Sequence, residues 1–150
     1  MSGTVYWITG LAGAGKSTIG KALYNQLSKQ FDNLVFLDGD EIREIFGNDL
    51  GYSEEDRRKN AFRISRLCKY LSDQGIHVVC STISMFHDVR DWNPKHITNY
   101  KEIYLKVPID LLVKRDQKGL YSKAISGEIT NVLGITSNFE EPKAPDLVLH

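Results

Sequence analysis

The sequence predicts an α/β fold in which a parallel sheet is sandwiched between layers of helices. The first observation is that short apolar runs alternate with segments of helical spacing from the amino terminus to about residue 115. The second is a glycine-rich turn that directly follows the first apolar run. Helices that connect successive strands pack on both faces of such a sheet, so the strands lie parallel. With 150 residues, 41% of them hydrophobic, we expect one domain over residues 1–150.

The expected elements follow from hydrophobic spacing and from residues that begin or end helices. Ser53 precedes three acidic residues and predicts the start of the longest helix, and Gly75 predicts its end. The run 116–145 places glycines and prolines among polar residues, which is typical of a functional lid. We expect strands at 4–9, 34–38, 76–82, 101–107 and 146–150, and helices at 16–30, 40–46, 54–74, 86–98 and 109–115.

The turn after the first expected strand has the spacing of a phosphate-binding loop. The segment Gly10–Ser17 matches the pattern G-x-x-x-x-G-K-[ST]. Backbone N–H groups of such a loop surround phosphate oxygens, Lys16 adds a positive charge, and Ser17 offers a hydroxyl to Mg²⁺. The alternative is a glycine-rich turn with a solvated lysine. We expect a bound nucleoside triphosphate, contacted by Gly10, Gly13, Ala14, Gly15, Lys16, Ser17 and Thr18.

A second group of chemically active residues follows the next expected strand. Asp38 and Asp40 come directly after the apolar run 34–37, and the carboxyl end of a parallel strand opens into the ligand crevice. Transfer of a γ-phosphoryl group to a hydroxyl requires a proton acceptor, and the metal requires oxygen ligands. Asp40 is therefore a candidate base and metal ligand. In the alternative interpretation Asp38 is a turn residue and Asp40 caps the next helix.

Composition excludes several classes of function. Nineteen basic and nineteen acidic side chains give no net charge, which argues against broad binding to nucleic acid or to an anionic membrane. Cys68 and Cys80 lack metal-type spacing and are expected to be small buried side chains of a cytoplasmic protein. No leader and no apolar run of about 18 residues is present, so we expect neither secretion nor membrane spanning. None of the four histidines has the spacing of metal ligands. Trp7 lies in the first expected strand and is expected in the core.

Arg57, Asn60 and Arg63 recur at a spacing of three on the helix that begins near Ser53. By itself this spacing favours a solvated, ion-paired helix face. In its ordered motifs, however, the whole chain resembles the adenylylsulfate kinases, which transfer the γ-phosphate of ATP to the ribose 3′-hydroxyl of adenosine 5′-phosphosulfate. Besides the phosphate loop, the matching motifs are Asp38-Gly39-Asp40-x-x-Arg43, Gly51-Tyr52-Ser53-x-x-Asp56-Arg57-x-x-Asn60, Ile83-Ser84-x-Phe86, Arg115-Asp116-x-Lys118-Gly119-Leu120-Tyr121, Gly127-Glu128-Ile129, Gly134-Ile135 and Phe139-Glu140-x-Pro142-x-x-Pro145-Asp146-Leu147.

The resemblance implies a P-loop kinase-like three-layer α/β/α sandwich with a lid, Mg²⁺ as cofactor, and homodimers as a common assembly. It implies Asp40 and Lys16 as catalytic residues, Ser17 and Asp40 as metal ligands, and Arg115 as a donor contact. Tyr52 would stack on the acceptor base. The residues implied to bind the acceptor are Asp38, Asp40, Arg43, Tyr52, Arg57, Asn60, Ile83, Ser84, Phe86, Lys118, Gly119 and Leu120, with Val132 at the lid position facing the base.

Three departures from the family pattern leave the acceptor open. Phe62 stands where the family usually has an arginine, Met85 replaces a proline, and Val132 replaces a phenylalanine that sandwiches the adenine. Stacking on an aromatic ring contributes about 1–3 kcal/mol per base, so the valine is expected to relax base preference. The interpretations are therefore an adenylylsulfate kinase of sulfate assimilation, a kinase of another nucleotide, notably cytidine diphosphoramidate in capsular polysaccharide synthesis, or a non-catalytic nucleotide-binding module. The chain is also expected to lack the helix that usually follows the last strand.

Overall fold

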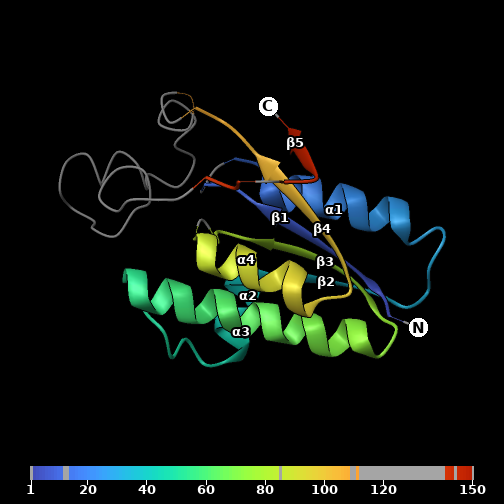
Figure 1. Ribbon diagram of the computed structural model, residues 1–150, viewed down its shortest axis with the longest axis horizontal. Coiled ribbons are helices and arrows are strands. Elements are labelled where there is room, and N and C mark those ends of the chain that lie inside the picture. Colours follow the sequence, from blue (N-terminus) through green and yellow to red (C-terminus); the bar gives the residue numbers. More distant parts are fainter. Residues whose placement is uncertain are drawn as a thin grey trace.

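The computed structural model describes residues 2–11, 14–84, 86–108, 111, 141–143 and 145–149. Within them five strands form one parallel sheet in the order β2-β3-β1-β4-β5 (Figure 1). The strands are β1 (Thr4–Thr9), β2 (Leu34–Asp38), β3 (His77–Thr82), β4 (Asn99–Leu105) and β5 (Leu147–Leu149). The helices are α1 (Lys16–Leu27), α2 (Gly39–Ile45), α3 (Glu54–Asp73) and α4 (His87–His96).

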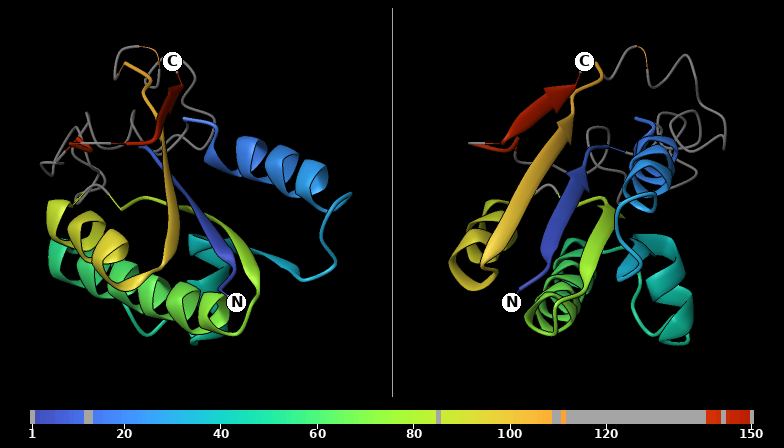
Figure 2. Two further views of the ribbon diagram at one scale, coloured as in Figure 1. Left: turned by 45° about the vertical axis from the view of Figure 1, so that its right-hand side comes forward. Right: turned by 90° about the vertical axis from the view of Figure 1, so that its right-hand side faces the viewer.

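The side chains of the central strand alternate between two hydrophobic cores, one on each face of the sheet. Val5 and Trp7 face a core that also holds side chains from α2, α3 and α4, whereas Ile8 faces a core against α1. Figure 2 shows α1 on one side of the sheet and α3 with α4 on the other. This arrangement confirms the predicted three-layer α/β/α sandwich.

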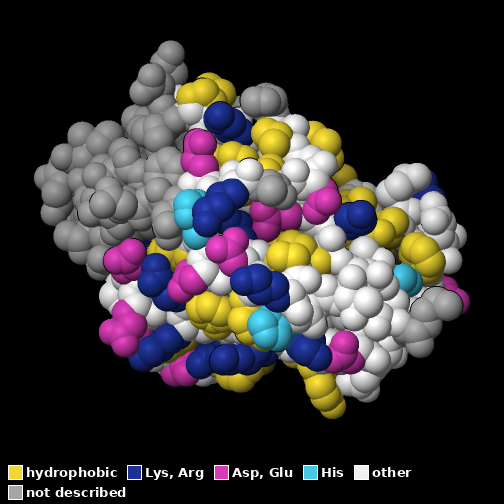
Figure 3. Space-filling model, viewed as in Figure 1, with side chains coloured by type: hydrophobic (Ala, Val, Ile, Leu, Met, Phe, Trp, Pro, Cys, Tyr) yellow, Lys and Arg dark blue, Asp and Glu magenta, His cyan; other side chains and the backbone are white. Residues whose placement is uncertain are grey.

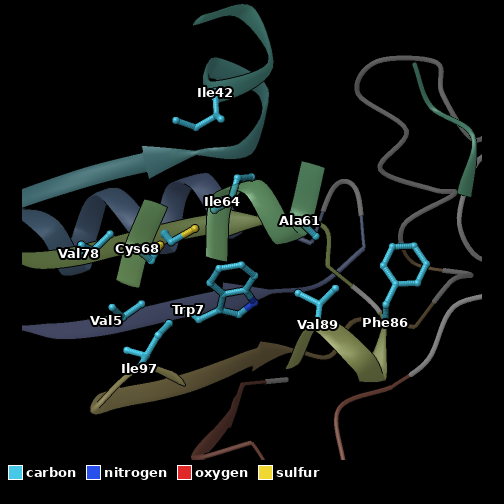
Figure 4. Close-up of a cluster of buried hydrophobic side chains, with 11 residues drawn as sticks. Val5, Trp7, Ile42, Ala61, Ile64, Cys68, Val78, Phe86, Val89 and Ile97 are labelled. Atoms are coloured by element: carbon cyan, nitrogen blue, oxygen red, sulfur yellow. The ribbon is translucent and has the colours of Figure 1, made fainter. Parts of the chain in front are cut away.

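The core beneath α3 and α4 is built around Trp7, which has no exposed surface. Figure 4 shows the Trp7 ring between Ile64 of α3 and Val89 of α4. Cys68 and Cys80 are free and fully buried in the same core, as the sequence predicts. Burial raises the pKa of the Cys80 thiol well above its ordinary value.

Several element boundaries differ from the predicted ones by a few residues. Helix α1 ends at Leu27 because residues 28–30 form a turn, and β4 covers Asn99–Leu105 rather than 101–107. The predicted ends of α3 are confirmed: the Ser53 hydroxyl accepts a hydrogen bond from the backbone N–H of Asp56, and Gly75 follows the helix at φ 82°. The expected helix 109–115 and lid 116–145 lie mostly outside the described residues.

The strand register places the carboxyl ends of three neighbouring strands at one edge of the sheet. Thr9 of β1 pairs with Thr82 of β3, and Asp38 of β2 pairs with Ser81 of β3. The segments that leave these ends therefore meet in one place, at the point where the strand order reverses direction. None of the described helices is both long and apolar enough to span a membrane.

Candidate active site

The phosphate loop connects β1 to α1 at this edge of the sheet. Gly15 has φ 98°, a left-handed conformation that favours glycine, and it directly precedes the first residue of α1. The Lys16 ammonium folds back over the loop and donates to the carbonyl of Leu11 at 3.0 Å. The backbone carbonyl of Lys16 accepts a hydrogen bond from the Ser81 hydroxyl of β3 at 3.0 Å. This bond attaches the start of α1 to the sheet. Gly13 lies outside the described residues.

The carboxylate of Asp38 joins the phosphate loop to the acidic cluster. One of its oxygens accepts the Ser17 hydroxyl at 2.9 Å, and the other accepts the backbone N–H of Asp40 at 2.9 Å. Asp38 is thus the N-cap of α2, and the alternative interpretation, in which Asp40 caps this helix, is wrong. Asp40 instead lies in the first turn with an exposed side chain. A Cβ on Gly39 would lie 3.0 Å from the Thr82 hydroxyl, so glycine lets α2 begin close against β3.

Two arginines and a tyrosine form a compact positive cluster beside α2. Arg43 is 8% exposed and donates to the carbonyl of Gly51 at 2.8 Å, and Arg57 donates to the carbonyl of Tyr52 at 2.9 Å. Their guanidinium carbons lie 4.6 Å and 5.5 Å from the centre of the Tyr52 ring. Burial and the charge of Arg43 lower the pKa of Arg57, against the opposing effects of Tyr52 and Asp40. The negative charge of Asp40 therefore acts on Arg57 of this cluster.

The three residues at a spacing of three on α3 do different things. Asn60 is buried, and its side-chain oxygen has no hydrogen-bond partner among the described residues. Arg63 turns away to a bidentate pair with the Asp49 carboxylate at 2.9 Å and 3.0 Å. This hydrogen bond from Arg63 is the main cause that lowers the pKa of Asp49. Arg57 and Asn60 remain candidates for ligand binding, whereas Arg63 is occupied by an exposed ion pair.

The segment that leaves β3 is held in place by hydrogen bonds to two other elements. The Ser84 hydroxyl accepts the indole N–H of Trp7 at 2.8 Å and donates to the Thr9 hydroxyl at 3.3 Å. The Ser84 carbonyl accepts a guanidinium N–H of Arg90 at 2.7 Å. Ser84 has no exposed surface, so its side chain supports the segment from within.

Phe86, which the resemblance implies as an acceptor residue, and Phe62, which departs from the family pattern, both pack against other side chains. Phe86 is 1% exposed in the core, and the Arg58 guanidinium lies 4.7 Å from its ring centre. Phe62 packs edge-on against Trp92, with 6.4 Å between ring centres. The predicted site residues Gly13, Arg115, Lys118, Gly119, Leu120 and Val132 lie outside the described residues.

The histidines form no metal site in the part of the chain that is described, where no group of three or more potential His, Cys, Asp or Glu ligands occurs. His87 makes a hydrogen bond through Nε2 to the carbonyl of Glu141 at 2.7 Å and so connects α4 to the segment before β5. Figure 3 shows positive and negative side chains interspersed over α3 and α4, with no large area of one sign. This agrees with the zero net charge of the chain.

Sequence reasoning missed two contacts of the site. It placed Asp38 among the acceptor residues but did not connect it with Ser17; the position of Asp38 as the last residue of β2 was the available signal. No spacing in the sequence singles out Arg90, because its contact to Ser84 depends on how α4 packs against the sheet.

Comparison with known proteins agrees with this geometry. The sequence profile of the family described as adenylylsulphate kinase matches residues 2–150. The chain belongs to the adenylylsulfate kinase family. It is therefore a phosphotransferase of the P-loop kinase fold.

Two relatives of this kinase have different names. It is 47% identical over 146 residues to the cytidine diphosphoramidate kinase of Campylobacter jejuni subsp. jejuni serotype O:2. This alignment covers 97% of this chain and 85% of the relative. It is 45% identical over 148 residues to the adenylyl-sulfate kinase of Bacillus velezensis, which covers 97% and 75% respectively. Among solved structures, the Mycobacterium tuberculosis APS kinase in complex with AMPPNP and APS matches with a TM-score of 0.90 at 37% identity, over 99% of this chain and 88% of the other.

Proposed function

We propose that this kinase binds the phosphates of ATP in the loop Gly10–Thr18 and transfers the γ-phosphoryl group to the ribose 3′-hydroxyl of a nucleotide held by the arginine cluster. The observation that carries the proposal is the Ser17 to Asp38 hydrogen bond of 2.9 Å. It joins the phosphate loop to the aspartates that precede the arginine cluster. The ATP phosphates and the acceptor hydroxyl would therefore both lie beside these aspartates. The solved relative with AMPPNP and APS supports two nucleotide sites in this fold.

The residues around Asp38 fit a Mg²⁺ ion. The ion prefers oxygen ligands and is often held by one or two carboxylates together with substrate phosphates. Ser17 and Asp38 offer a hydroxyl and a carboxylate side by side, and Asp40 adds a carboxylate two residues further along the chain. When bound, the ion would neutralise charge on the β- and γ-phosphates.

Asp40 would accept the proton of the attacking hydroxyl. Its side chain is exposed in the first turn of α2, and its charge acts on Arg57, which supports a position of the carboxylate near the arginine cluster. In the transfer, the bond from the 3′-oxygen to the γ-phosphorus forms, the bond from the γ-phosphorus to the bridging oxygen breaks, and ADP leaves. Lys16 and the loop amides would stabilise the charge that develops on the phosphoryl oxygens.

Arg43 and Arg57 would hold the compact anionic group of the acceptor, because guanidinium groups bind such anions through paired hydrogen bonds. Tyr52 is 56% exposed and would offer a ring face to the acceptor base. Asn60 would accept a hydrogen bond at its unpartnered buried side-chain oxygen. Ile83 and the backbone of Ser84 would form the wall of the acceptor site, closed by Lys118, Gly119 and Leu120, with Arg115 on the donor. We also propose that the kinase forms a homodimer.

Adenosine 5′-phosphosulfate is the first candidate acceptor, and cytidine diphosphoramidate is the second. The second matches the name of the Campylobacter jejuni relative at 47% identity. It is also supported by Phe62 and Val132, which stand where the family pattern has an arginine and an aromatic clamp. Loss of one aromatic face weakens the preference for a purine.

Parallel assays that follow ADP release with MgATP and either acceptor test the proposal. We expect turnover that depends on the acceptor, and we expect Asp40→Ala to abolish most of it. ATP binding without such turnover would identify a non-catalytic nucleotide-binding module, and near-complete activity of Asp40→Ala would remove Asp40 from the mechanism. Val132→Phe is expected to shift preference toward adenosine 5′-phosphosulfate; unchanged preference would contradict the role given to this position.

A further inference from the structure

We propose that Arg90 is a positioning residue, which fixes the segment 83–86 and thereby sets the affinity for the acceptor nucleotide without touching either substrate. The inference rests on the proposed function, in which this segment is one wall of the acceptor site. The Arg90 guanidinium donates to the Ser84 carbonyl at 2.7 Å, and the Arg90 backbone N–H donates to the Phe86 carbonyl at 3.3 Å, a helical bond that does not depend on the side chain. Both contacts come from the first turn of α4.

The guanidinium of Arg90 is buried, with 5% of the residue exposed. A buried charge is unfavourable unless hydrogen bonds and an opposite charge compensate for it. Glu102 of β4 is also 5% exposed; burial raises its pKa most strongly, and the charge of Arg90 acts in the opposite direction. The Tyr100 hydroxyl donates to the Glu102 carboxylate at 2.7 Å. Arg90 thus holds the segment after β3 through its hydrogen bond to the Ser84 carbonyl, and its positive charge acts favourably on the Glu102 carboxylate of β4.

The same segment is anchored on its other side by β1. The Trp7 indole and the Thr9 hydroxyl both contact the Ser84 hydroxyl. Figure 4 shows the indole nitrogen of Trp7 on the side of the ring that faces Val89 and Phe86. These contacts hold Ser84 against β1 and do not involve the phosphate loop itself. On the opposite side of Ser84, the charged guanidinium of Arg90 holds the backbone carbonyl.

Removal of the guanidinium should move the wall and not the phosphate loop. Arg90→Met leaves the Ser84 carbonyl without this donor and Glu102 without its nearby cation, while Lys16 and Ser17 keep their own contacts. Misplacement by about 1 Å costs about a hundredfold in rate, so a smaller shift of the wall is expected to lower kcat/KM for the acceptor about tenfold, seen as a rise in the acceptor KM. The KM for ATP should change by less than about twofold, because the donor loop is untouched.

The experiment compares Arg90→Met and Arg90→Lys with Lys95→Met, an exposed substitution on the same helix. The kcat and both KM values are measured with whichever acceptor turns over, and ATP binding is measured by titration with a non-hydrolysable analogue. Arg90→Lys keeps the positive charge and is expected to recover part of the acceptor affinity. Lys95→Met is expected to leave all constants unchanged.

A spectroscopic readout tests the segment without any acceptor. The chain has two tryptophans, so Trp92→Phe leaves Trp7 alone to report on its hydrogen bond to Ser84. Arg90→Met in this background is expected to shift the Trp7 emission while ATP binding is retained. An unchanged emission together with an unchanged acceptor KM would overturn the proposal, as would an equal rise in both KM values. If no acceptor is phosphorylated by the parent protein, the proposed function has failed, and the Trp7 shift alone then supports or overturns the positioning role.

Discussion

Replacement of Asp38 by asparagine would separate two tasks that its carboxylate performs. One oxygen accepts the Ser17 hydroxyl, and the other accepts the backbone N–H of Asp40 at the start of α2. Asparagine caps a helix about as well as aspartate does, but it carries no charge. The variant Asp38→Asn should therefore keep the helix cap and lose the negative charge beside the proposed metal site.

The loss of the helix cap and the loss of the negative charge should have different magnitudes. Loss of the cap in Asp38→Ala should cost about 1 kcal/mol, or about 2–4 °C in Tm for a chain of this length. Asp38→Asn should lose almost none of this stability. Both variants should lose about a hundredfold to a thousandfold in kcat, the range found when one preorganised electrostatic group is removed.

The assay is acceptor-dependent ADP release at saturating MgATP, with thermal unfolding of the same samples. Wild-type kcat in Asp38→Asn would refute the metal role of Asp38. An Asp38→Asn protein as destabilised as Asp38→Ala, with its activity otherwise intact, would show that the carboxylate serves the fold alone.

Two further predictions concern stability. Ser53→Ala removes the hydroxyl that accepts the Asp56 N–H at the start of α3, and should lower the free energy of unfolding by about 1 kcal/mol in urea titration; a loss near zero would contradict the cap. The pKa of Asp49 lies below its ordinary 3.8 because Arg63 hydrogen-bonds its carboxylate. The stability from this pair is thus present above that value and is lost as pH falls through the lower, folded-state pKa. The unfolding difference between wild type and Asp49→Asn should therefore vanish in strong acid and shrink in high salt; a difference that grows in acid would contradict the assignment.

The fold could be predicted from the sequence because its signals are local. The apolar run of β1, the glycine at the start of α1 and the Ser53 cap each depend on neighbours in the chain. These signals place every described strand and helix within a few residues of its predicted range.

The internal order of the site could not be predicted in the same way. The distinction between Asp38 as the helix cap and Asp40 as the free carboxylate depends on how α2 begins against β3. The pairing of Arg63 with Asp49 depends on how α3 packs against the loop that precedes it, and the pairing of Arg90 with Ser84 depends on how α4 packs against the segment after β3. A spacing of three on a helix shows which side chains share a face, but not which of them already has a partner.

The most direct test of the account is a structure of this kinase with Mg²⁺ and a non-hydrolysable ATP analogue. The account predicts one ligand site, in which Lys16 and the loop amides contact the terminal phosphates while Ser17, Asp38 and Asp40 face the same phosphates and metal. A complex in which Lys16 and Asp40 face separate cavities, too far apart to share the triphosphate, would contradict it.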